Sequence, residues 1–137
     1  MRRIILFLIL SFVMPYANAA WTLIFENEET DSRYYVDINS ILKKQQNVRM
    51  LTLEDFRSPQ LIKKKSFQLK YNSIKSFVEF DCTAKKMRIL TYLVYKDQMA
   101  KGETVFDKST PLGWSKVNEN TMDESYLNIA CNEAVIN

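Results

Sequence analysis

Two cysteines, Cys82 and Cys131, constrain the fold of this chain more than any other residues. The stretch that ends at Cys82 alternates in character, and the apolar residues Ile74, Val78 and Phe80 share a face with Cys82. A strand with this pattern presents Cys82 to the core. Near the end of the chain, a second apolar stripe repeats at helical spacing: Tyr126, Leu127, Ala130, Cys131 and Ala134. A bond between the two sulfurs would therefore pin a C-terminal helix across a sheet.

The N-terminal residues predict export. Arg2 and Arg3 precede an apolar run over residues 4–14, and the small residues Ala17 and Ala19 occupy the positions that a signal peptidase reads. An uncleaved membrane anchor is the alternative, but the run is roughly half as long as a bilayer crossing requires. We therefore expect a secretory signal peptide.

This expectation divides the chain into a signal peptide over residues 1–19 and one domain over residues 20–137. The domain would lie in the periplasm or at the cell surface, in an oxidising compartment where Cys82 and Cys131 are expected to form a disulfide. The residue directly after the expected cleavage site is Ala20 and not cysteine, so a lipid anchor on an N-terminal cysteine is not predicted, nor is a transmembrane segment in the mature chain.

Aromatic and β-branched residues are plentiful, whereas the chain has only 2 glycines and 3 prolines. Alternation predicts strands over residues 21–26, 33–37, 48–56, 65–82, 87–96 and 103–106, the fourth with a bend near Asn72. A turn, or one helical turn capped by Asp37, is expected over residues 37–44, and a further turn over residues 57–60. The fold class is thus α+β: a curled antiparallel sheet of five to six strands, with a C-terminal helix packed on it.

The helix is predicted over residues 122–134. Thr121 and Glu124 have the spacing of a capping box, in which each side chain satisfies a free amide of the first turn. Asp123 suits the positive end of the helix dipole.

The chain contains no histidine, which removes the usual general base and the commonest zinc ligand. No glycine-rich phosphate loop is present, and acidic neighbours such as Glu54 and Asp55 point to opposite faces of a strand. We therefore expect no enzyme activity, no catalytic residue, no cofactor and no metal site.

Positive charge is concentrated in the middle of the chain. Without Arg2 and Arg3, the basic residues number 17 against 16 acidic ones, a net charge of +1, yet residues 57–88 alone carry +7. The segment contains two runs of lysine, over residues 63–65 and 85–86. The simpler interpretation is that these lysines are solvated turn residues beside hydrophobic strands. The sharper interpretation is a contact for a sulfated or other anionic glycan, for lipopolysaccharide-type phosphates or for an acidic protein. Both runs would contribute to it at one rim: Lys63, Lys64, Lys65, Lys85 and Lys86. Tyr34 and Tyr35 are the alternative contact residues, and nucleic acid is disfavoured by the export signal.

The chain resembles the surface-adhesin protein E family of bacterial envelope proteins. The resemblance rests on residues spread over the mature chain: Trp21, the Tyr34-Tyr35-Val36-Asp37 run, Ser40-Ile41, Val48, residues 76–82, Arg88-Ile89-Leu90, Gly102, Trp114 and Cys131. It implies an antiparallel sheet with a C-terminal helix, Cys82 and Cys131 as the structural pair, and a tendency to form homodimers. It also implies binding of host matrix or serum proteins. The function expected is thus that of an exported, non-enzymatic envelope binding protein, and the alternative is an inhibitor or accessory factor of a periplasmic enzyme.

Overall fold

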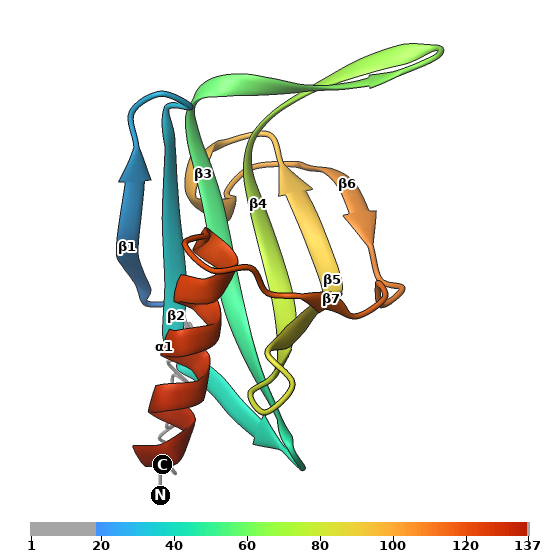
Figure 1. Ribbon diagram of the computed structural model, residues 1–137. Coiled ribbons are helices and arrows are strands. Elements are labelled where there is room, and N and C mark those ends of the chain that lie inside the picture. Colours follow the sequence, from blue (N-terminus) through green and yellow to red (C-terminus); the bar gives the residue numbers. More distant parts are fainter. Residues whose placement is uncertain (1–18, 137) are drawn as a thin grey trace, which may run out of the picture.

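The computed structural model describes residues 19–136, so the signal peptide predicted over residues 1–19 lies outside the described residues except for Ala19. Strands occupy the first part of this region and one helix ends it (Figure 1). The elements are β1 (Trp21–Asn27), β2 (Ser32–Lys44), β3 (Asn47–Lys64), β4 (Phe67–Asp81), β5 (Lys86–Tyr95), the 3₁₀ turn η1 (Gln98–Ala100), β6 (Thr104–Lys108), β7 (Ser115–Lys116) and α1 (Met122–Ile136). Within residues 19–136, no helix is long and apolar enough to cross a membrane.

All strand pairs are antiparallel, and the sheet order follows the chain from β1 to β6. The short strand β7 pairs with the first residues of β5, whereas β6 pairs with its last residues. The predicted α+β fold is therefore confirmed. Sequence reasoning missed β7, since two residues are too few to show a period.

The turn predicted over residues 37–44 is wrong, because β2 continues through it. The amide of Asn39 donates to Asp37 Oδ1 (3.0 Å), and the hydroxyl of Ser40 donates to the carbonyl of Asp37 (2.6 Å). Ser40 Oγ also accepts the amide of Leu51 on β3 (2.8 Å). The register between β2 and β3 shifts between Asp37 and Leu42, and the side-chain hydrogen bonds replace the missing backbone hydrogen bonds there. These turn-forming residues therefore produce a bulge in a continuous strand.

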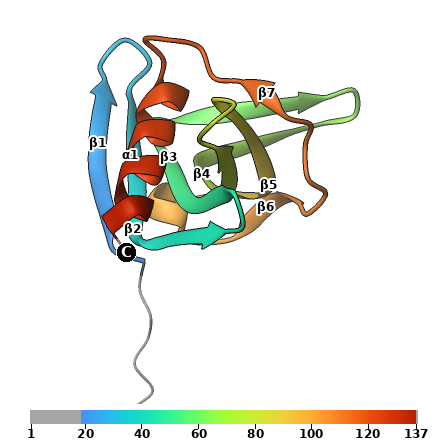
Figure 2. The ribbon, with the colours of Figure 1, turned by 60° about the horizontal axis from the view of Figure 1, so that its bottom comes forward.

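The turn predicted over residues 57–60 is also wrong. β3 runs through Pro59 with a register shift between Asp55 and Gln60, and the side-chain amide of Asn72 on β4 donates to the carbonyl of Phe56 (3.1 Å). A proline cannot donate to a ladder, but an irregular stretch does not require that bond. Beyond this bend, residues 60–71 form a two-stranded arm that projects from the sheet (Figures 1 and 2).

The helix α1 covers one face of the sheet, called here the helix face (Figure 1). The buried core between them consists of Val36, Val48, Met50, Val78, Phe80, Met87, Val117, Tyr126, Leu127 and Ala130. The predicted disulfide joins Cys82 to Cys131 at an S–S distance of 2.03 Å, with both residues beside this core. The amide of Glu124 donates to Thr121 Oγ1 (3.3 Å) as predicted, but the Glu124 carboxylate accepts the amide of Asn120 (2.8 Å), one residue earlier than the capping box places it.

The other face of the sheet, called here the open face, carries the buried ion pairs. Glu79 is 2% exposed and accepts hydrogen bonds from Arg49 Nε (2.9 Å) and Arg88 Nε (2.7 Å). Asp55 is fully buried, pairs with Arg33 and accepts the amide of Met99 in η1 (2.6 Å). Glu79 and Asp55 therefore each have a guanidinium partner, whereas Asp37, which is 7% exposed on the same face, accepts the amide of Asn39 and has no ion pair within residues 19–136.

Candidate functional site

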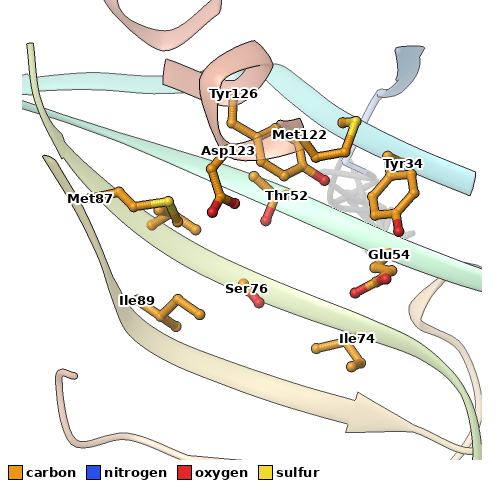
Figure 3. Close-up of a pocket in the computed structure, with 11 residues that line it drawn as sticks. Tyr34, Thr52, Glu54, Ile74, Ser76, Met87, Ile89, Met122, Asp123 and Tyr126 are labelled. Atoms are coloured by element: carbon orange, nitrogen blue, oxygen red, sulfur yellow. The ribbon is translucent and has the colours of Figure 1, made fainter. Parts of the chain in front are cut away.

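A cavity of about 160 Å³ lies on the helix face, beneath the first turn of α1 (Figure 3). Five elements contribute to it: β2, β3, β4, β5 and α1. Its walls are Tyr34, Thr52, Glu54, Ile74, Ser76, Val78, Met87, Ile89, Met122, Asp123 and Tyr126. None of these lining residues is lysine or arginine, so the polar groups of the cavity are carboxylates, hydroxyls and phenols.

Strand alternation places these side chains. On β3, the buried residues Val48, Met50 and Thr52 face the helix, and Glu54 is the next residue with the same parity. Its neighbour Asp55 points to the open face, as the sequence predicted. Asp123 and Tyr126 are three residues apart on α1, so they share one side of the helix and meet Glu54 across the cavity.

Partial desolvation raises the pKa of both carboxyl groups, although Glu54 is only half-buried and Asp123 is exposed at the surface. The pKa of Glu54 rises because of desolvation, an effect that hydrogen bonding with Tyr34 opposes and the negative charge of Asp123 reinforces. The pKa of Asp123 rises through desolvation. Neither carboxylate forms an ion pair with any residue in the described range 19–136.

The two phenols differ in their surroundings. The Tyr34 hydroxyl accepts a hydrogen bond from Ser32 Oγ (3.3 Å). Tyr126 is only 8% exposed, and no described residue forms a hydrogen bond with its hydroxyl, which Figure 3 shows on the cavity side of the ring. Desolvation, together with the negative charges of Glu54 and Asp123, raises the pKa of Tyr126, so its hydroxyl remains protonated at neutral pH.

Of the contact residues predicted from the sequence, only Tyr34 lines this cavity. Tyr35 points to the open face and is buried. Glu54, Asp123 and Tyr126 were not predicted as site residues. The only signal was an acidic residue at a core-facing position of β3, and Asp123 had a sufficient explanation in the helix dipole.

The two lysine runs do not meet at one rim. Lys63, Lys64 and Lys65 lie at the end of the arm, where Lys65 and Ser66 make its turn. Lys85 and Lys86 lie beyond the opposite end of β4 (Figure 1). The 15 residues of β4 separate the runs, and at about 3.3 Å per residue this strand is too long for one small ligand to bridge.

Comparison with known proteins shows relatives of this fold. A model of the family described as surface-adhesin protein E matches residues 21–132. One structure of Haemophilus influenzae protein E has 15% identity and a TM-score of 0.56, covering 72% of this chain and 80% of its own. Protein E from non-typeable Haemophilus influenzae has 12% identity and a TM-score of 0.57, covering 90% and 84% respectively. At these identities the structural likeness shows the fold alone. The comparison with curated proteins finds no match.

Proposed function

This chain belongs to the surface-adhesin protein E family, and from that membership we propose that it is an exported, non-enzymatic binding protein of the bacterial envelope. Its partner in this proposal is a protein or a glycan that carries negative charge. The single observation that carries the proposal is the arm over residues 60–71, which projects from the sheet (Figure 2).

The arm combines positive charge with exposed apolar side chains. Leu61 and Phe67 are 45% and 50% exposed, and Lys63, Lys65 and Lys70 are exposed as well. No acidic residue occurs within residues 60–71. Isolated edge ribbons usually avoid exposed aromatic and aliphatic groups, because such groups promote unwanted association. An aromatic anchor among cationic side chains is instead typical of a surface that contacts a partner.

Retention of the mature protein on heparin and on immobilised matrix proteins tests the arm. The triple variant K63Q/K64Q/K65Q is expected to lose retention, and wild-type retention should fall steeply as ionic strength rises. The matched control K43Q/K44Q/K101Q removes the same charge from exposed positions elsewhere. K85Q/K86Q tests the second lysine run separately. If the folded arm variant elutes with the wild type, the arm is not the contact.

Export and self-association require their own measurements. N-terminal sequencing of the protein from an envelope fraction is expected to begin at Ala20, and protease treatment of intact cells distinguishes surface display from a periplasmic pool. Light scattering of the purified protein tests the homodimer that the family resemblance predicts.

A further inference from the structure

The cavity beneath α1 is separate from the arm and has its own chemistry. Its charged groups are the two carboxylates of Glu54 and Asp123, with no cationic side chain, so both charges of the cavity repel an anion. Its other walls are largely apolar, among them Ile74, Val78 and Ile89. A ligand that fits must therefore carry positive charge at one end and an apolar stem at the other.

The hydroxyl of Tyr126 is independent evidence that a ligand belongs in the cavity. Its oxygen is open to the cavity, since Arg33 Nε is the one fully buried side-chain polar atom without a hydrogen-bond partner in the described part of the chain. Tyr126 is more than nine-tenths buried, lines the cavity and has no hydrogen-bond partner among residues 19–136. A donor entering the cavity would satisfy this oxygen.

Two buried carboxylates of the open face contrast with the carboxylates of the cavity. Glu79 and Asp55 each have an arginine partner. Glu54 and Asp123 lack one, although a lysine or arginine at a lining position such as Ile74 or Ile89 would supply it. The missing positive charge is the feature that a ligand would complete.

We propose that this cavity binds a small primary ammonium group on an unbranched alkyl stem, with Glu54 and Asp123 as counter-charges and the Tyr126 hydroxyl as an acceptor. The ammonium group offers three donors, which match these three groups in number. The stem lies against the aliphatic walls. The volume limits the ligand to about six non-hydrogen atoms, since an apolar cavity of about 150 Å³ holds benzene.

The test titrates n-pentylammonium into the mature protein and follows amide chemical shifts by NMR. Two probes of the same length, neutral 1-pentanol and anionic pentanoate, separate charge recognition from apolar filling. Saturable shifts around residues 52–54, 74–76 and 122–126 are expected with n-pentylammonium and at least about tenfold weaker binding with the other two, the factor that one lost charge contact of about 1.4 kcal/mol produces. Equal binding of 1-pentanol would overturn the proposal.

Three variants assign the roles. E54Q keeps the shape of the side chain, and Y126F removes one oxygen atom, so both are expected to fold. Each should weaken n-pentylammonium binding, E54Q by about tenfold or more. E103Q, an exposed carboxylate on the segment before β6, is the matched control and should bind as the wild type does. Wild-type affinity in both E54Q and Y126F would reject the site.

A primary ammonium on an alkyl stem occurs in free amines and in lysine side chains. A parallel titration with Nα-acetyl-lysine methylamide distinguishes these sources. Binding of n-pentylammonium alone supports a free amine as the occupant, binding of both supports an inserted lysine side chain, and the failure of both overturns the proposal. Loss of the arm's heparin retention leaves these titrations unaffected, so the two hypotheses fail independently.

Discussion

Two carboxylates on each face of the sheet have opposite surroundings. On the open face, Glu79 is held by Arg49 and Arg88, and Asp55 by Arg33 and the amide of Met99. Burial alone would raise the pKa of Glu79, but the hydrogen bonds and charges of the two arginines outweigh it and hold the pKa below its ordinary range.

On the helix face, Glu54 and Asp123 have no such partners in the described chain, and their pKa values are raised. Ionised carboxylates in that state reduce the stability of the fold at neutral pH. The comparison therefore separates acids that stabilise the molecule from acids that cost stability. Proteins retain the second kind mainly where they serve binding or chemistry.

Removing α1 uncovers only one of the two faces and should have the largest effect. Truncation after Asn120 deletes Tyr126, Leu127 and Ala130, which cover the helix-face core, and leaves the ion pairs of the open face in place. We expect the fragment over residues 20–120 to aggregate, because a large apolar surface becomes exposed. A soluble monomer with native-like circular dichroism would show that the open face alone holds the sheet together.

Replacing Cys131 by Ser should have the next largest effect. The disulfide spans 49 residues and ties α1 to the end of β4, so its loss is expected to cost about 2–4 kcal/mol of unfolding free energy. Denaturant unfolding of C131S against the wild type measures this cost. An unchanged unfolding midpoint would mean that helix packing alone fixes α1 on the sheet.

Replacing Glu79 by Gln should destabilise the open face by about 2–3 kcal/mol. Removing one partner of a fully buried ion pair costs about 3–5 kcal/mol. The loss expected here is smaller because Arg49 and Arg88 are 26% and 30% exposed and can reach water. The pKa of Glu79 is lowered in the folded state, so its stabilisation is present above the ordinary glutamate pKa and is lost as the pH falls through the folded value. Unfolding curves at pH 7 and pH 3 are therefore expected to differ less in E79Q than in the wild type.

Replacing Glu54 by Gln should have the smallest effect on stability and the opposite sign. The pKa of Glu54 is raised in the folded state, so its ionisation penalty is absent below the ordinary pKa of 4.5 and complete above the folded value. E54Q is thus expected to gain up to about 1 kcal/mol at pH 7 and nothing at pH 3. Thermal unfolding at both pH values measures this. A loss of stability in E54Q at pH 7 would place Glu54 with the stabilising acids of the open face.

Much of the fold follows from local pattern, and the candidate site does not. The parity of Cys82 on β4 and the helical stripe through Cys131 predict the disulfide, which the structure contains. The capping pair Thr121 and Glu124 marks the start of α1 to the residue. From the sequence, the bulge after Asp37 and the bend at Pro59 could not be distinguished from turns that reverse the chain. The same residue types favour a bulge and a turn, and only pairing with the neighbouring strand decides which one forms.

Sequence by itself determined which face of its own element each residue occupies, because strand and helix periods are local properties of the backbone. It therefore placed Glu54 and Asp55 on opposite faces, and Tyr126 and Cys131 toward the core. Only the tertiary structure decided what each face meets. The separation of the lysine runs, the projection of the arm, and the meeting of Glu54 with Asp123 and Tyr126 depend on strand register and on the position of α1. These relations are set by packing between elements distant in the chain, and no local pattern encodes them.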